Sequence, residues 1–233
     1  MPGDGRPYGG LSPGERKALR RRKLLDTALE LYGTNGYSAT SIEQICSKAR
    51  VTTRHFYEEY EGREQLLKAL YAEVVSNVTN NVVEALANAS SDFASLIRAG
   101  VDAFVRTLLT DSRMGRIFCV EVVGVSQELE IYRRSVLHLI AQVVQQQADS
   151  IRKNQQIRYL DGLNFTYPTL ALVGGSIELI TEWIIGDHNL SIDDMIDEIT
   201  WLYLALGSIL LGLGNEVAED PSYFPRSRTT TNK

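Results

Sequence analysis

The sequence has 233 residues, of which 44% are hydrophobic, so it can bury one large core or two small ones. Its six prolines lie mostly near the ends, and the alternating pattern typical of strands is absent, so the composition excludes a β-rich fold and favours long helices. The net charge of −5 is uneven: residues 1–63 hold eleven Lys/Arg against eight Asp/Glu, a net of +3, which leaves −8 for residues 64–233. A basic head on an acidic body indicates that only the head meets a polyanion.

Signatures of catalysis, metal binding and secretion are not found in the sequence. It holds no repeated Glu-x-x-His, no phosphate loop and no nucleophile with a base at useful spacing, so we do not expect an enzyme. The two cysteines, Cys46 and Cys119, lie far apart among apolar neighbours, and the three histidines are isolated. This pattern predicts buried thiols in a reducing compartment, with no metal or other cofactor. Because no apolar signal-peptide run is present, we expect a cytoplasmic protein.

The first predicted helix follows a short tail. Residues 1–12 are rich in Gly and Pro, so we expect a disordered segment. Pro13 is suited to the first turn of a helix that runs to about Thr34, with Ser12 as its cap. Asn35-Gly36 is a signal for the end of that helix.

The stretch from Thr40 to Tyr60 is predicted to form two short helices joined by a tight turn. We expect Thr40 to cap the first helix, with Glu43 three residues later closing a capping box. Thr52 is expected to cap the second. Phe56 and Tyr60 then point back toward the first helix, which leaves the outward face of the second helix free. That outward face carries Thr53, Arg54, His55 and Tyr57.

The body is predicted to be helical throughout. Apolar residues at three- and four-residue spacing predict a long helix from Arg63 into the high eighties, which connects the head to the body. Two shorter segments follow, the first capped by Ser91 or Asp92 and the second by Asp111 or Ser112. A further long helix then runs to about Asn154.

Two strongly apolar helices close the chain, over about Tyr167 to Ile185 and Ile192 to Leu213, the second capped by Ser191 with Asp194. The charge-free run from Ile199 to Asn215 is at the short limit for a membrane span and contains glycines, so a buried interface is favoured and no membrane partner is expected. Two such helices exceed what one core absorbs, which favours a homodimer through them. The expected interface residues are Gly174, Ile177, Thr181, Trp201, Ala205, Ser208, Ile209 and Gly212.

The helix pair has the features of a module that reads double-stranded DNA. Short polar side chains at the start of the second helix suit the major groove, and we expect base contacts from Thr53, Arg54 and His55. Helix N-termini and hydroxyls suit phosphates. The expected phosphate contacts are Thr40, Ser41, Thr52, Tyr57, Arg63 and Arg50. The alternative is an ordinary helix pair with exposed polar residues.

The same residues resemble a known family. Residues 36–41 read GYSATS, residues 45–52 read ICSKARVT, and residues 56–66 read FYEEYEGREQL. Together they are similar to the N-terminal domain of the TetR family of bacterial transcriptional regulators, over about residues 15–70. Three features depart from the family pattern: Arg50 where Gly is usual, at a turn position that often needs a positive φ; Arg54 where a small residue is common; and Glu58-Glu59 near the end of the second helix. The two acids are expected to be solvated or paired with Arg54, Arg63 or the first helix.

The resemblance implies an all-α fold: a helix-turn-helix domain over 13–62, a helical effector-binding and dimerisation domain over 63–219, and a disordered tail over 220–233. It implies a homodimeric regulator, expected to be a repressor that binds a palindromic operator and is released by a small hydrophobic or aromatic effector. The alternative is a helical dimeric adaptor or lipid-binding protein without sequence-specific DNA binding. Candidate pocket residues are Phe104, Phe118, Glu121, Tyr132, His138, Phe165 and Trp183. The basic run from Arg16 to Lys23 is either a solvated face or a phosphate-facing patch.

Overall fold

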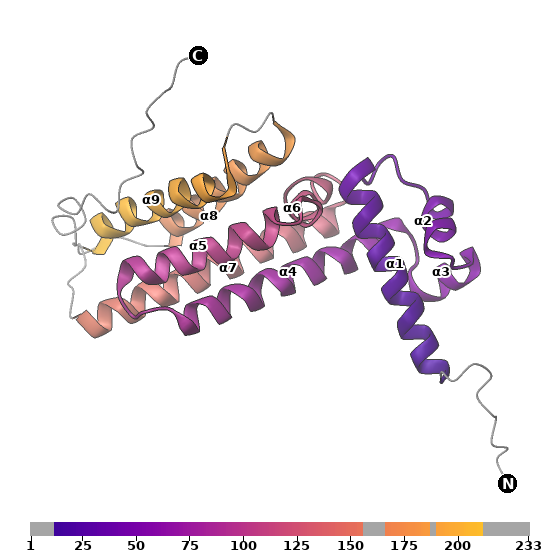
Figure 1. The fold of residues 1–233 in the computed structure, drawn as a ribbon, viewed down its shortest axis with the longest axis horizontal. Helices are drawn as coiled ribbons and strands as arrows, with labels where there is room; N and C mark the ends of the chain where they lie inside the picture. The colour runs from indigo at the N-terminus through magenta and orange to yellow at the C-terminus, as the bar shows by residue number, and fades with distance from the viewer. Residues whose placement is uncertain (1–11, 156–165, 187–189, 212–233) are drawn as a thin grey trace, which may run out of the picture.

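The computed structural model describes residues 12–155, 166–186 and 190–211, and the regular structure within these ranges is helical. The head consists of α1 (Pro13–Asn35), α2 (Ile42–Ala49) and α3 (Thr53–Glu59). The body contains α4 (Arg63–Asn88), α5 (Phe93–Leu109), α6 (Ser112–Arg116), the π-helical turn η1 (Ile117–Glu121), α7 (Gln127–Gln155), α8 (Thr166–Ile185) and α9 (Ile192–Leu211). Figure 1 shows the head at one end of an elongated bundle, which α4 enters directly from the head. The predicted all-α architecture is confirmed.

The local signals in the head mostly act as the sequence predicts. Ser12 caps α1 and closes a capping box with Glu15, and Pro13 stands at the first turn. Thr52 caps α3 by accepting a hydrogen bond from the backbone N–H of His55. The prediction for α2 is wrong by one residue, because Ser41 is its cap and Gln44 closes the box.

The register of that cap follows from Thr40. Its side chain is only 1% exposed, and its hydroxyl donates to the carbonyl of Gly36 at 2.8 Å. Because this hydroxyl is used inside the preceding turn, the next residue supplies the cap. Gly36 itself has φ +90°, a conformation that L side chains rarely adopt, and it ends α1 as the sequence predicts.

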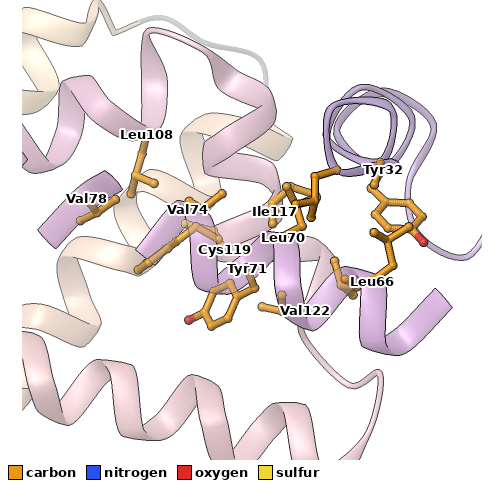
Figure 2. Close-up of a cluster of buried hydrophobic side chains, with 14 of the residues drawn as sticks. Tyr32, Leu66, Leu70, Tyr71, Val74, Val78, Leu108, Ile117, Cys119 and Val122 are labelled. Carbon is orange, nitrogen blue, oxygen red and sulfur yellow. The ribbon is translucent and has the colours of Figure 1, made fainter. Parts of the chain in front are cut away.

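The head and the body share one hydrophobic core. Figure 2 shows α4 running through it, with Leu66 near Tyr32 of α1 at one end and Val78 near Leu108 of α5 at the other. Between them, Leu70, Tyr71 and Val74 meet Ile117 and Cys119 of η1 and the nearby Val122. The side chains in this group are almost completely buried, and burial of each large one stabilises the fold by roughly 1.5–3 kcal/mol. The two parts of the chain are therefore mechanically continuous along α4.

A close approach of α1 and α6 adds to this connection. A Cβ atom placed on Gly33 would lie 2.5 Å from the Cβ of Arg113, so only glycine fits at this crossing. The short α6 therefore rests directly on the end of α1, one turn before the chain turns toward α2. Arg113 is in turn held by Asp111, the N-cap of α6, through two side-chain hydrogen bonds of 2.8 and 2.7 Å.

The remaining body helices agree with the predicted elements. Asp92 caps α5, Asp111 caps α6, and Ser191 forms reciprocal hydrogen bonds with Asp194 at the start of α9. The π-helical turn η1 was not predicted. In the part of the chain that the structure describes, one helix, α8, is long and apolar enough to cross a membrane by length and composition. The sequence instead suggested residues 199–215 as a possible membrane span, and 212–215 of these lie outside the described ranges. The predicted turn at 161–162 also lies outside them.

Candidate functional site

The outward face of α3 is free, as the sequence predicts. The Arg54 side chain is 87% exposed and Tyr57 is 56% exposed, while Phe56 on the opposite side is fully buried. The Nε of Arg54 donates to Glu58 at 3.3 Å, an exposed pair of the kind that contributes little energy. The terminal guanidinium nitrogens of Arg54 therefore keep their capacity for a bidentate contact with a base edge.

His55 differs from its neighbours on α3. It is half-buried, and its Nδ1 lies 3.0 Å from the hydroxyl of Thr52. This contact holds the ring against the start of the helix. Thr53 and Arg54 are both exposed, so they are the two predicted base-reading residues that are most accessible from solvent.

The turn between α2 and α3 contains the left-handed residue that the sequence anticipates. Arg50 has φ 53° and ψ 43°, and its N–H donates back to the end of α2. A non-glycine residue pays about 1–2 kcal/mol for this conformation. The exposed side chain of Arg50 lies beside a shallow concavity, which is also lined by Glu43, Ser47 and Thr53. The substitution of arginine for glycine thus places a cation next to the face that carries the candidate base contacts.

One predicted phosphate contact, Thr40, is corrected by its placement, and a second, Arg63, is partly occupied by contacts within the chain. The Thr40 hydroxyl is buried and bonded to Gly36, so it cannot reach a phosphate, whereas Ser41 is half-exposed at the N-terminus of α2. The guanidinium of Arg63 donates to the carbonyls of Tyr37 and Thr40 at 3.1 and 2.5 Å, and it lies 4.9 Å from the centre of the Tyr37 ring. These contacts hold the segment that leads into α2, but Arg63 stays half-exposed, so its phosphate contact remains a prediction.

The basic run on α1 mainly holds the head together. Glu59, at the end of α3, has a side chain that is 1% exposed, and it faces Arg20 at 3.6 Å and Lys17 at 4.0 Å. Arg21 lies over the ring of Tyr60 at 5.3 Å, and Arg22 pairs with Asp26 and with Glu73 of α4. These contacts fix α3 and α4 against α1, and they explain the pairing of Glu59 with the first helix. Most of the run is still exposed, as a solvated face requires, and the phosphate-facing alternative stays a prediction.

Glu121 forms the bridge between the body and the head. Its carboxylate, 9% exposed, accepts a hydrogen bond from the backbone N–H of Tyr37 at 2.6 Å and one from Nε of Arg116 at 2.7 Å. The sequence placed Glu121 in a ligand pocket, and this is corrected. Because Tyr37 precedes α2, the carboxylate of Glu121 and the guanidinium of Arg63 hold the two sides of one residue in the lead-in to the helix pair. We call this arrangement the junction bridge.

The body contains an apolar cavity of about 130 Å³, which is partly open and is lined by residues of α4, α5, α7, α8 and α9. The lining residues are Val82, Leu86, Phe93, Leu96, Ile97, Gly100, Val101, Phe104, Ile140, Val143, Val144, Gln147, Ala148, Thr169, Leu172, Val173, Ser176, Ile199, Tyr203 and Gly207. The polar side chains among them are few, so the cavity suits a ligand that is mostly hydrocarbon.

Of the predicted pocket residues, Phe104 lines this cavity. Phe118 lies behind it, with ring centres 6.0 Å apart, and Tyr132 packs on Tyr71 in the core. Trp183 is away from the cavity and donates through Nε1 to the carbonyl of Leu190, while His138 is exposed on α7. Phe165 lies outside the described residues. The pocket residues predicted from the sequence are bulky or polar, whereas the residues that line the cavity are mainly aliphatic and come from five helices.

The outer face of α8 and α9 carries part of the predicted dimer interface. A Cβ on Gly174 would meet open space, and Trp201 and Ala205 are half-exposed. Ile177 instead packs on the chain's own core and Ser208 is buried, so these two face inward in the single chain. Thr181 is half-exposed, and its place in the interface stays a prediction. Exposed side chains that the sequence list omitted are Leu179, Ile185 and Leu202. The side chain of Ile209 and all of Gly212 lie outside the described residues.

Comparisons with known proteins agree with this geometry. Residues 24–70, which include α2 and α3, match the family model described as "Bacterial regulatory proteins, tetR family". The transcriptional activator FasR of Mycolicibacterium smegmatis is 31% identical over 117 residues, which cover 49% of this chain and 53% of that protein. The transposon Tn10 TetC protein of Escherichia coli is 40% identical over 50 residues, 22% of this chain and 25% of that protein. The matches thus span about half or less of these curated relatives.

Solved structures extend the similarity to the whole fold. The fatty acid degradation regulator FadR of Bacillus halodurans has a TM-score of 0.67 at 16% identity, over 79% of this chain and 94% of that one. FadR of Bacillus subtilis, solved in complex with stearoyl-CoA, has a TM-score of 0.67 at 18% identity, over 80% and 97% of the two chains. At these identities the likeness shows a shared fold, from the helix-turn-helix head to the helical body.

Proposed function

We propose that this chain, which belongs to the TetR family of bacterial regulatory proteins, regulates transcription in the cytoplasm by binding operator DNA as a homodimer and responds to an apolar effector in its body. The observation that carries the proposal is the combination of two features in one continuous core. An exposed face on α3 stands at one end, and a partly open apolar cavity lies at the other. Such a chain can exchange binding energy between two distinct sites.

In the proposed complex, α3 enters the major groove. Thr53 and Arg54 face the bases, and Arg54 is suited to donate two hydrogen bonds to O6 and N7 of a guanine. Phosphates are met by the exposed Tyr57 and Arg50 and by the backbone N–H groups at the start of α2, next to Ser41. A homodimer then places two copies of α3 about 34–36 Å apart, which matches a palindromic operator.

The proposed dimer forms through the outer face of α8 and α9. An apolar helix such as α8 needs a covering partner in water, and Leu179, Ile185 and Leu202 are exposed on these two helices of the single chain. The open space over Gly174 allows the backbone of a partner helix to approach closely. We therefore assign these residues, with Trp201 and Ala205, to the interface between two copies.

The proposed effector carries a long hydrocarbon portion. A cavity near 150 Å³ lined by apolar side chains is known to hold a benzene-sized molecule, so the cavity of about 130 Å³ takes a group of similar size. A longer chain must therefore spread the helices around it. The stearoyl-CoA bound to the B. subtilis relative supports an acyl effector of this kind. Val82 and Leu86 place α4, which begins in the head, among the helices that must move.

A short series of contacts connects the cavity to the head. Phe104 lines the cavity and packs on Phe118 of η1, and three residues later Glu121 holds the N–H of Tyr37 in the junction bridge. π-helical turns occur frequently at functional sites in helices. We infer that a ligand which displaces Phe104 shifts η1, and that the bridge passes this shift to the lead-in of α2.

Repression relieved by the effector is the mode of action proposed from the sequence. The name of the M. smegmatis relative, a transcriptional activator, favours activation as a second candidate. A reporter assay with the selected operator placed upstream of a weak promoter separates the two, because only an activator raises expression from that position.

The proposed function is tested by operator selection followed by titration. A random duplex pool is selected with the full chain, and the affinity of the winning duplex is measured at about 50 and 200 mM salt, with and without stearoyl-CoA. We expect affinity for the duplex to fall steeply with salt and to change by about 5- to 150-fold with the effector. If no sequence is enriched and a dimer still forms, the dimeric adaptor without sequence-specific binding is the correct description.

A further inference from the structure

One residue that lines the apolar cavity carries a buried hydroxyl with only a long hydrogen bond. Tyr203 of α9 lines the cavity and is 8% exposed, and its Oη lies 3.5 Å from Oγ of Ser176 on α8. Hydrogen bonds between hydroxyls normally span 2.5–3.0 Å, so this contact is long. Ser176 has a better partner of its own, because its hydroxyl donates to the carbonyl of Leu172 at 2.8 Å. The single hydroxyl hydrogen of Ser176 is thus used within α8.

The hydrogen of Tyr203 therefore has only the long contact with Ser176 Oγ as its partner. Burial raises the pKa of Tyr203 above its ordinary value, so the phenol remains protonated at neutral pH and acts as a donor. Ser176 Oγ keeps a lone pair that faces the same gap, since its own hydrogen points to Leu172. A buried donor without a good acceptor costs free energy, which a ligand that brings an acceptor recovers.

We propose that Tyr203 and Ser176 form a polar subsite inside the cavity, which selects an effector with an oxygen atom, such as a hydroxyl or a carbonyl, partway along its hydrocarbon portion. That this ligand acts as an effector rests on the proposed function. Its chemical class rests only on the residues that line the cavity. A ligand hydroxyl at this point accepts from Tyr203 Oη and donates to Ser176 Oγ. A plain hydrocarbon makes no hydrogen bond with Tyr203, while an oxygen placed against the aliphatic lining residues is desolvated without a partner.

The first experiment uses ring-sized probes that fit the cavity. Benzene and phenol are titrated into the full chain and into Tyr203→Phe, with ligand-observed NMR as the readout. We expect Tyr203→Phe to weaken phenol about tenfold and to leave benzene within about twofold, because the substitution removes only the hydroxyl. Tyr132→Phe, which removes a hydroxyl outside the cavity lining, is the matched control and is expected to change neither. Equal effects on both probes, or none on phenol, overturn the subsite.

The second experiment locates the oxygen along an acyl chain. Stearoyl-CoA is compared with hydroxystearoyl-CoA thioesters that carry the hydroxyl at successive carbons. We expect the thioester with its hydroxyl at one position, or at two adjacent ones, to bind as tightly as stearoyl-CoA or more tightly. The other hydroxystearoyl-CoA thioesters should bind more weakly than stearoyl-CoA. In Tyr203→Phe the favoured thioester should lose its advantage over the others. If every position weakens binding alike, the selection is wrong. If no thioester binds while phenol still distinguishes Tyr203→Phe, the subsite stands and the acyl effector of the proposed function fails.

Discussion

The head and the body of this chain are both helical, but they hold their functional residues in different ways. In the head, Thr53, Arg54 and Tyr57 take their positions from short-range signals: a cap at Thr52, a left-handed residue at Arg50 and one buried anchor at Phe56. In the body, the cavity is formed where five helices meet, and none of its lining residues is set by a local signal. A recognition surface can thus be encoded in a few neighbouring residues, whereas a ligand cavity is a property of packing.

The largest expected effect is at the shared core along α4, where a substitution tests whether the head and the body fold as separate parts. Leu70 is 1% exposed and lies between the head and the body, so Leu70→Ala should leave a cavity and lower the free energy of unfolding by about 2–5 kcal/mol. If the two parts share one core, thermal unfolding followed by circular dichroism should remain a single transition at a lower temperature. Leu19→Ala, on the exposed face of α1, is the control and should change the free energy by less than about 0.5 kcal/mol. Two separate transitions in Leu70→Ala would mean that the head folds alone.

The base-reading role of α3 gives the next largest effect. Arg54→Ala should cost about 1–3 kcal/mol for the preferred operator and relax the choice of base at one position in each half-site, because a bidentate contact is lost. Tyr57→Phe, which removes only an exposed hydroxyl, should weaken all duplexes alike. Parallel titrations of both variants against the selected operator and a single-base variant measure this difference. If Arg54→Ala weakens binding to both duplexes equally, Arg54 contacts phosphates and not bases.

The same contrast explains which features of the structure could be predicted from the sequence. The helices, their caps at Ser12, Thr52 and Ser191 and the strained turn at Arg50 were predictable, because each depends on residues within a few positions. Long-range partners were not. Arg63 looked like an exposed cation, but it donates to carbonyls more than twenty positions away, and Glu121 looked like a pocket residue, but it meets Tyr37 across 84 positions. Charge and spacing alone do not reveal which distant carbonyl or N–H a side chain will satisfy.

The junction bridge offers a way to separate coupling from binding. Glu121→Gln keeps an acceptor for the N–H of Tyr37 but weakens the hold of Arg116, since the charge is lost. We expect the operator affinity without effector to change by less than about threefold, and the effect of stearoyl-CoA on that affinity to fall by about 1–2 kcal/mol. Effector affinity in the absence of DNA, measured by calorimetry, should stay within about twofold, because Glu121 is not among the residues that line the cavity.

Two outcomes would sharpen or remove this role. Glu130→Gln makes the same change at a half-buried carboxylate that pairs with Arg133 on α7, and it should leave the effector response intact. If Glu121→Gln responds to the effector as the unmodified chain does, the signal travels along α4 instead, through Val82 and the shared core. If both effector affinity and response fall together, Glu121 supports the shape of the cavity.

The smallest effect is expected at Arg50, where the local encoding of the head can be tested directly. Glycine relieves the left-handed strain, but it also raises the conformational entropy of the unfolded chain, so Arg50→Gly should stabilise the fold by no more than about 1 kcal/mol. If Arg50 meets a phosphate, the same substitution should weaken the operator complex and reduce the slope of its affinity against salt by about one charge. Arg50→Ala keeps the strain and removes the charge, so it should share the loss of slope without the gain in stability. If the slope of affinity against salt is unchanged in both variants, Arg50 has no part in DNA binding. The strained backbone at this turn would then serve no role in the operator complex.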